Sequence, residues 1–233
     1  MNNHILSVTL QQDKFPDKNH YPFALPIFNF TKQLTFETPV TFFVGENGTG
    51  KSTLLEAIAL ACKVHIWRRD EGTRFHVNPY EKQFFRYMTV VWKNGMVPGS
   101  YFGSEIFNDF RRIVDNWAAS DPGQLECFGG KSLVAQSHGQ SMLSFFESRY
   151  RIKGIYFLDE PETALSPKSQ LKLLEIIRKN TEQGHAQFII ATHSPILLAC
   201  ENARIYSFDH QSIRLTGYKE TDHYKLYKKL LNE

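Results

Sequence analysis

A glycine-rich segment, residues 45–52, limits the possible folds of this 233-residue chain more than any other feature. It reads Gly-Glu-Asn-Gly-Thr-Gly-Lys-Ser and matches the pattern G-x-x-x-x-G-K-[ST] without a gap. A β-rich run at 39–44 precedes it, and apolar residues recur at helical spacing over 54–62 after it. Because a strand, a glycine loop and a helix follow one another, the backbone N–H groups of the loop can surround an anion at a helix N-terminus.

The residue types of this loop suit the binding of nucleotide phosphates. Glycines allow a close approach of the backbone, the Lys51 ammonium can reach the outer phosphates, and the Ser52 hydroxyl can ligate Mg²⁺. A glycine-rich turn with a lysine present by chance is the alternative, and the matching strand and helix disfavour it. We therefore expect ATP contacts from the loop and the residue after it: Gly45, Glu46, Asn47, Gly48, Thr49, Gly50, Lys51, Ser52 and Thr53.

Two adjacent carboxylates, Asp159 and Glu160, directly follow the apolar run 155–158. Four consecutive apolar residues are typical of a buried strand, and ligands of open α/β sheets bind beyond the carboxyl ends of the strands. At that edge Asp159 can hold Mg²⁺ together with Ser52, and Glu160 can act as the general base toward a water molecule. The alternative is a cap at the start of a helix, because Pro161 follows.

His193 follows the strand expected at 187–191. An imidazole at this position can contact the γ-phosphate of ATP and respond to its loss. A lone histidine at the end of a strand is more often structural, but its position after the two carboxylates favours the functional interpretation.

Strands and helices alternate along most of the chain, which predicts an α/β fold with a mostly parallel sheet flanked by helices. Aromatic residues and turn dipeptides mark about 66–150 as an inserted helical or mixed lobe within a single domain of 1–233. The further elements expected are a strand near 87–92, helices near 105–118, at 138–150 and over 168–180, and a strand pair at 205–208 and 213–215. A terminal helix over 219–232 is expected to dock on the core through Tyr224, Tyr227, Leu230 and Leu231.

Composition limits the classes of protein to which the chain can belong. No apolar run approaches the roughly 20 residues that span a bilayer, and the N-terminus lacks a signal pattern, so we expect a soluble, cytoplasmic protein. The three scattered cysteines, Cys62, Cys127 and Cys200, suggest buried free thiols. The net charge of +3 is weaker than that of a dedicated nucleic-acid-binding domain, although charge can be local.

Taken together, these motifs resemble the ABC ATPase superfamily of P-loop NTPases over roughly residues 28–210. Residues 45–52 are similar to its Walker A motif, 158–161 to its Walker B motif with the catalytic glutamate, and 192–194 to its switch histidine. Residues 136–141, Gln-Ser-His-Gly-Gln-Ser, resemble its signature sequence, with matches at Ser137, Gly139 and Gln140. The resemblance implies a homodimer in the ATP-bound state, in which these three residues face the ATP of the opposite subunit.

Several positions depart from the usual pattern of that superfamily. Ser166 stands where the D-loop usually has aspartate, and Gln136 and His138 replace two residues of the signature. No clear Q-loop glutamine is present, and Gln83 or Glu105 could fill that place. The adenine-stacking aromatic stays open among three candidates: Tyr21, Phe23 and Phe28.

The resemblance implies an ATPase that uses ATP and Mg²⁺, with Glu160 and His193 as catalytic residues. The Glu-Pro-Glu and Leu-Ser-Pro sequences after Asp159 look more like soluble ATPases related to chromosome-structuring and break-repair proteins. We therefore expect a DNA-related or defence process, with DNA or a nuclease or other effector protein as a partner. A nucleotide-binding subunit of a membrane transporter and a non-catalytic ATP switch are the alternatives, and a membrane partner is less favoured.

One further segment bears on a role with DNA. Residues 67–69, Arg74 and residues 82–86 interleave basic and aromatic side chains, a pattern compatible with binding of single strands. Asp70, Glu71 and Glu81 dilute this charge, so a solvated surface of the lobe is the favoured interpretation.

Overall fold

The computed structural model describes residues 3–66, 78–80, 82–128 and 130–231. Part of the mixed basic and aromatic pattern, at 67–69 and Arg74, lies outside the described residues. Within the described residues, no helix is both long enough and apolar enough to cross a membrane. The expected cytoplasmic location stays a prediction.

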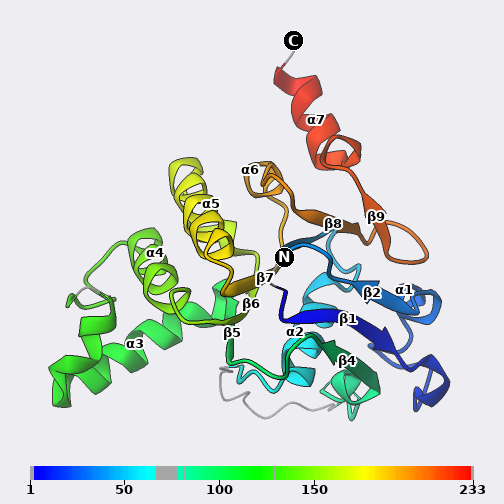
Figure 1. The fold of residues 1–233 in the computed structure, drawn as a ribbon, viewed down its shortest axis with the longest axis horizontal. Coiled ribbons are helices and arrows are strands. Elements are labelled where there is room, and N and C mark those ends of the chain that lie inside the picture. Colours follow the sequence, from blue (N-terminus) through cyan, green and yellow to red (C-terminus); the bar gives the residue numbers. More distant parts are fainter. Residues whose placement is uncertain (1–2, 67–77, 81, 129, 232–233) are drawn as a thin grey trace.

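In the described part of the chain, six strands form the central sheet, in the order β5-β6-β7-β3-β8-β9 (Figure 1). Every neighbouring pair is parallel except β8 and β9, which run antiparallel. The strands are β3 (Val40–Val44), β5 (Gly99–Gly103), β6 (Gly154–Asp159), β7 (Ala186–Ala191), β8 (Arg204–Ser207) and β9 (Arg214–Thr216). The expected α/β class is confirmed, and so are the strands expected just before the glycine loop and the two carboxylates, which are β3 and β6.

The three central strands β6, β7 and β3 are buried on both faces, which explains why they are mostly apolar. Successive side chains point to opposite faces, so Phe157 packs in the cluster under α2 (Lys51–Ala61), whereas Tyr156 and Leu158 pack in the opposite cluster. That second cluster includes α5 (Pro167–Glu182) and α6 (Pro195–Leu198). Because β3, β6 and β7 are packed on both faces, the loops that follow them begin at fixed positions along the carboxyl edge of the sheet.

A second, antiparallel sheet covers the α2 side of the molecule. Its strands are β2 (Gln33–Thr35), β1 (Ile5–Leu10) and β4 (Met88–Trp92), in that order. Ile5 and Val8 are fully buried and pack in the same cluster as Leu54 of α2. Helix α1 (Pro26–Phe30) adds Phe28 to that cluster.

The boundaries predicted for the inserted lobe need correction. Strand β4 pairs with β1, and β5 pairs with β6, so both belong to the sheets. The part that extends sideways in Figure 1 runs from α3 (Ser104–Ser120) through η3 (Pro122–Phe128) to α4 (His138–Arg149). Strand β5 was not predicted because glycines occupy both of its ends. Gly99 is needed there, since a Cβ at this position would lie 2.6 Å from the carbonyl oxygen of Ile155.

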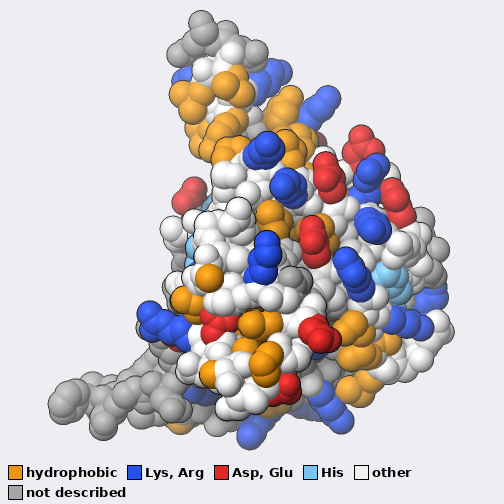
Figure 2. Space-filling model, turned by 90° about the vertical axis from the view of Figure 1, so that its left-hand side faces the viewer, with side chains coloured by type: hydrophobic (Ala, Val, Ile, Leu, Met, Phe, Trp, Pro, Cys, Tyr) orange, Lys and Arg blue, Asp and Glu red, His pale blue; other side chains and the backbone are white. Residues whose placement is uncertain are grey.

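The expected docking of the terminal helix on the core is wrong for most of its length, because only Tyr224 of the four expected residues is half-buried. None of the residues of α7 (Asp222–Leu231), all of which the structure describes, is buried. Leu230 is 70% exposed and Leu231 is 80% exposed. The helix projects from the body of the molecule, and hydrophobic side chains gather on it at the top of Figure 2. Amphipathic spacing predicted an apolar face here, but spacing cannot say what covers such a face.

The thiols expected to be buried differ in their exposure. Cys62 is buried and free, and its withdrawal from water raises its pKa to about 12. Cys200 is half-buried and free, and burial raises its pKa to about 11. The side chain of Cys127 lies outside what the structure describes.

Candidate nucleotide-binding site

The glycine loop joins the end of β3 to the start of α2, as the sequence predicts. Gly50 caps α2 with a φ of 100°, and a Cβ at this position would lie 2.8 Å from Cζ of Phe28. Glycine is therefore required here both by the left-handed backbone and by the close approach of a buried ring. Residues 46–48 form the exposed part of the loop, and the free N–H groups of the first turn of α2 follow it.

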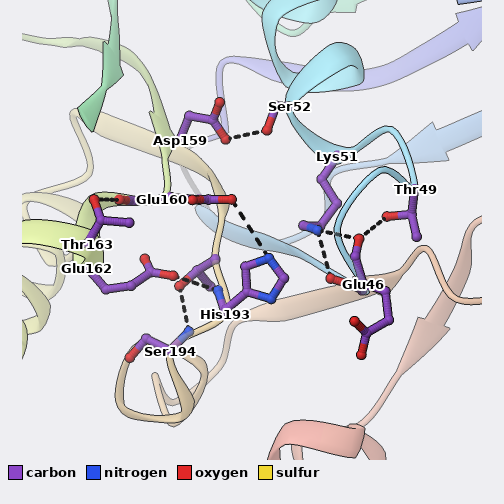
Figure 3. A network of polar contacts seen from close by, with 12 residues as sticks. Glu46, Thr49, Lys51, Ser52, Asp159, Glu160, Glu162, Thr163, His193 and Ser194 are labelled. Carbon is purple, nitrogen blue, oxygen red and sulfur yellow. Dashed lines mark hydrogen bonds and ion pairs between the residues drawn. The ribbon is translucent and has the colours of Figure 1, made fainter. Parts of the chain in front are cut away.

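Lys51 lies inside this loop and is only 4% exposed. Its Nζ donates hydrogen bonds to the carbonyl oxygens of Gly45 at 2.7 Å and Glu46 at 2.8 Å. Burial lowers the pKa of the ammonium, and the negative charges of Glu160 and Asp209 partly oppose this shift. The lysine is thus held at the centre of the loop, where a phosphate would approach it (Figure 3).

Ser52 and Asp159 lie beside Lys51, and each offers an oxygen atom that could ligate a metal ion. The hydroxyl of Ser52 donates to Oδ1 of Asp159 at 2.9 Å, and the hydroxyl of Tyr101 donates to Oδ2 at 3.0 Å. Burial is the main reason why the pKa of Asp159 rises to about 6, and these two hydrogen bonds partly oppose it. A hydroxyl and a carboxylate are hard oxygen ligands of the kind that Mg²⁺ prefers, so the two residues fit the expected ion.

Glu160 has an unusual backbone conformation, with φ of 45° and ψ of 54°. Its N–H donates to the carbonyl oxygen of Ala191 at 2.9 Å, which ties the end of β6 to the end of β7. A left-handed conformation of a residue with a side chain costs on the order of 1 kcal/mol or more. This strain turns the carboxylate toward His193, whose Nε2 lies 3.8 Å from Oε1 of Glu160.

His193 lies on the loop after β7, where the sequence predicts it. Its backbone N–H donates to Oε1 of Glu162 at 2.6 Å. Burial lowers the pKa of its imidazole, Lys51 lowers it further, and Glu160 opposes both. The ring is therefore mostly neutral near pH 7, and Figure 3 shows it across from Lys51 and Glu160.

Two family models match parts of this chain. One is described as "AAA domain, putative AbiEii toxin, Type IV TA system" and matches residues 98–199, and the other is described as "AAA domain" and matches residues 27–87. They cover the segments that carry the carboxylates and the glycine loop respectively.

Similar proteins and structures agree with these matches. The petrobactin import ATP-binding protein FpuD of Bacillus anthracis is 24% identical over 207 residues, which are 81% of this chain and 75% of that protein. The thiamine import ATP-binding protein ThiQ of Ruegeria sp. (strain TM1040) is 27% identical over 164 residues, which are 65% of this chain and 69% of that protein. The structure of cbiO1 from Clostridium perfringens, part of the ABC transporter complex cbiONQ, has a TM-score of 0.56 at 15% identity, covering 98% of this chain and 96% of that chain. The SMC head domain from Thermotoga maritima has a TM-score of 0.50 at 16% identity, covering 92% of this chain and 99% of that chain.

The fold and the matched segments support an ABC-type P-loop ATPase. The resemblance drawn from the sequence is thereby confirmed at the level of the superfamily.

The signature-like segment of this ABC-type chain forms the start of α4. Ser137 caps the helix by accepting from the N–H of Gln140 at 3.3 Å, and the Gln140 side chain accepts from the N–H of Ser137 at 3.3 Å. A Cβ on Gly139 would lie 3.2 Å from the carbonyl oxygen of Ala164, so the helix start packs against the turn that follows Glu160. Within one chain Ser137 and Gln140 thus bond to each other, and the expected role of all three residues toward a second subunit stays a prediction.

Two contributors to this candidate site were missed by the sequence reasoning. Asp209 follows β8, and its Oδ1 accepts from the N–H of Glu46 at 2.7 Å, which fixes the first turn of the glycine loop. Its position just after a strand at the carboxyl edge is a signal that could have identified it. Tyr101, which holds Asp159, lies on the unpredicted strand β5 and offered no such signal.

The structure separates the three aromatic candidates for stacking on adenine. Phe23 and Phe28 are fully buried in the core. Tyr21 is 43% exposed, and its hydroxyl lies 2.5 Å from Oγ1 of Thr53, next to the glycine loop. Tyr21 therefore has a surface that a base could contact, whereas the two phenylalanines do not.

The two candidates for the Q-loop position also differ. The side chain of Gln83 donates to the carbonyl oxygen of Pro79 at 2.8 Å and lies before η2 (Phe84–Tyr87). Glu105 is the second residue of α3, which follows β5 directly, and Gly103 at the end of β5 lies opposite Asp159 in the sheet register. The backbone of Glu105 thus lies nearer in the fold to the end of β6, which carries Asp159, and the choice between the two candidates stays a prediction.

Proposed function

We propose that this chain binds ATP with Mg²⁺ and hydrolyses it in a dimer in which two chains enclose two nucleotides. The observation that carries the proposal is the 2.9 Å pair of Ser52 and Asp159 beside the buried Lys51. Glu160 follows β6 and His193 follows β7 at the same edge of the sheet, and their side chains lie 3.8 Å from one another. A phosphate group bound between Lys51 and these two side chains would be next to a cation, a metal site and a base.

Each side chain has a task that its position supports. Lys51 and the N–H groups at the start of α2 hold the phosphates, because both are positive and point into the loop. Ser52 and Asp159 would hold Mg²⁺, which supplies neutralisation of charge on the phosphates when bound. Asp159 binds the ion in its ionised form, so a pKa of about 6 leaves most of it ready at pH 7.

Glu160 is the general base in this proposal, and His193 is the group that contacts the γ-phosphate. A carboxylate can only accept, so Glu160 orients an attacking water and takes its proton. The imidazole, neutral because burial lowers its pKa, donates a hydrogen bond from Nε2 toward the phosphate. Because Glu160 and His193 are only 3.8 Å apart, both side chains can lie next to the same γ-phosphate.

The dimer completes the site in this proposal. Ser137, Gly139 and Gln140 begin a helix, and a helix N-terminus attracts an anion. In their own chain these residues pack beside the turn after Glu160. In the dimer, the same three residues of the second chain would contact the γ-phosphate. Closing and opening of the two chains is then the mechanical output of hydrolysis.

The process that the ATPase serves has two candidates. The sequence around Glu162 and Ser166 supports a DNA-related or defence process with a DNA or effector protein partner, and one matching family model carries the description of a putative toxin system. The two similar curated proteins are import ATP-binding proteins, which equally supports a nucleotide-binding subunit of a transporter. Co-purification of the full chain with a nuclease-like protein or with a membrane protein distinguishes the two.

The test of the ATPase proposal is steady-state hydrolysis of ATP by wild type, Glu160→Gln and the matched control Glu175→Gln, which changes an exposed carboxylate on α5. We expect wild-type turnover in the control and loss of at least 100-fold in Glu160→Gln, with an ATP-dependent dimer when the mass of that variant is measured. Wild-type turnover in Glu160→Gln would contradict the assignment of the base. ATP binding without hydrolysis in wild type would instead favour a non-catalytic switch.

A further inference from the structure

The imidazole of His223, in the first turn of α7, meets the imidazole of His193. Nε2 of His223 lies 3.3 Å from Nδ1 of His193, and the ring centroids are 5.4 Å apart with 52° between the planes. Thirty residues separate the two histidines in sequence. The sequence reasoning gave His223 no role.

The start of α7 is held firmly although the rest of the helix is exposed. Thr221 is 4% exposed, and its Oγ1 accepts from the N–H of Tyr224 at 3.2 Å. The hydroxyl of Tyr218 donates to the carbonyl oxygen of Pro195 at 3.2 Å, only two residues beyond His193. The rings of Tyr218 and Tyr224 lie 5.0 Å apart. These contacts fix His223 relative to the loop that carries His193.

The surroundings of His193 decide which of its nitrogens carries the proton. A neutral imidazole has one donor and one acceptor nitrogen. Oε1 of Glu160 lies 3.8 Å from Nε2, and because a carboxylate only accepts, it favours a proton on Nε2. Nδ1 is then the acceptor, and Nε2 of His223 must be the donor across the 3.3 Å contact.

We propose that His223 is a positioning residue, which donates from its Nε2 to Nδ1 of His193 and so keeps the Nε2 proton of His193 directed at Glu160 and the γ-phosphate. The proposal rests on the proposed ATPase function for its catalytic consequence, but not for the tautomer itself. It also links α7 to the ATP site, since moving the first turn of α7 removes the donor from His193.

The test compares the full-length wild type with His223→Phe, His223→Gln and the control His210→Phe. Phenylalanine keeps a ring but has no donor, whereas the side-chain amide of glutamine can donate from a similar place. His210 is an exposed histidine in the turn after β8. Nitrogen-15 NMR of labelled histidines reports the tautomer, and His193→Ala assigns the signal.

We expect the Nε2–H tautomer of His193 in wild type, His223→Gln and the control, and a mixture of tautomers in His223→Phe. For hydrolysis we expect kcat of His223→Phe to fall by roughly tenfold, with KM for ATP nearly unchanged and most activity regained in His223→Gln. An unchanged tautomer in His223→Phe would overturn the proposal, whatever happens to kcat. If wild type does not hydrolyse ATP, the proposed function fails, while a tautomer change in His223→Phe still supports the positioning role.

Discussion

Ser52 and Asp159 share a 2.9 Å hydrogen bond although 107 residues separate them in the chain. The pairing follows from the sheet, in which β3 and β6 both run parallel to β7 and therefore end at the same edge. Ser52 follows β3 by way of the glycine loop, and Asp159 is the last residue of β6. The fold thus brings together two side chains from two local sequence motifs, and we propose that they hold Mg²⁺.

The first prediction concerns Asp159→Asn. Because burial raises the pKa of Asp159 from 3.8 to about 6, the folded state binds its proton more tightly than the unfolded state does. Stability is therefore lost as the pH rises through about 6, when the carboxylate ionises away from water. We expect Asp159→Asn to unfold at a higher temperature than wild type at pH 7.5 without metal, while its ATP hydrolysis falls by at least 100-fold.

Thermal unfolding followed by circular dichroism at several pH values measures this difference. The advantage of Asp159→Asn should shrink as the pH falls from 7.5 to about 5, since the wild-type carboxyl becomes neutral there. A variant that is less stable than wild type at pH 7.5 would show that the bonds from Ser52 and Tyr101 outweigh the cost of burying the charge.

The second prediction concerns Asp209, whose Oδ1 accepts from the N–H of Glu46 at 2.7 Å. Asp209→Ala leaves this N–H without its acceptor, so the glycine loop loses its fixed first turn. We expect KM for ATP to rise by roughly three- to tenfold, which corresponds to about 1 kcal/mol for one hydrogen bond. Asp209→Asn keeps a carbonyl acceptor and should stay within about twofold of wild type. Equal effects of the two substitutions would assign the role to charge, and no effect of either would contradict it.

The sequence predicted the positions of the residues that belong to local motifs. Lys51, Ser52 and Glu160 could be placed because a strand followed by a polar loop has a known direction in a parallel sheet. Asp209 follows a strand that the sequence predicts, but its contact with the glycine loop depends on the pairing of β8 with β3. Tyr101 offered no local signal, and its contact with Asp159 depends on the pairing of β5 with β6. His223 depends on how a terminal helix packs, which no local pattern specifies.

The third prediction compares two glycines of the loop. Gly48 and Gly50 both have positive φ, of 80° and 100°, but a Cβ on Gly48 meets nothing within 4 Å, whereas one on Gly50 lies 2.8 Å from the buried Phe28 ring. Alanine at either position has backbone strain of about 1 kcal/mol, and at Gly50 it also overpacks the core by about 1–3 kcal/mol. Urea denaturation should therefore show a larger loss of unfolding free energy for Gly50→Ala. Equal losses would mean that the ring moves aside freely.

The last prediction concerns the exposed end of α7. Leu230 is 70% exposed, so Leu230→Lys removes no core contact and should change the unfolding free energy by less than about 0.5 kcal/mol. Leu173 on α5 is fully buried, and Leu173→Ala should cost about 2–5 kcal/mol in the same urea denaturation. Hydrolysis by Leu230→Lys should also match wild type, because the contact of His223 with His193 is made in the first turn of the helix. A destabilisation of Leu230→Lys that grows with protein concentration would show instead that this face of α7 is buried between chains in solution.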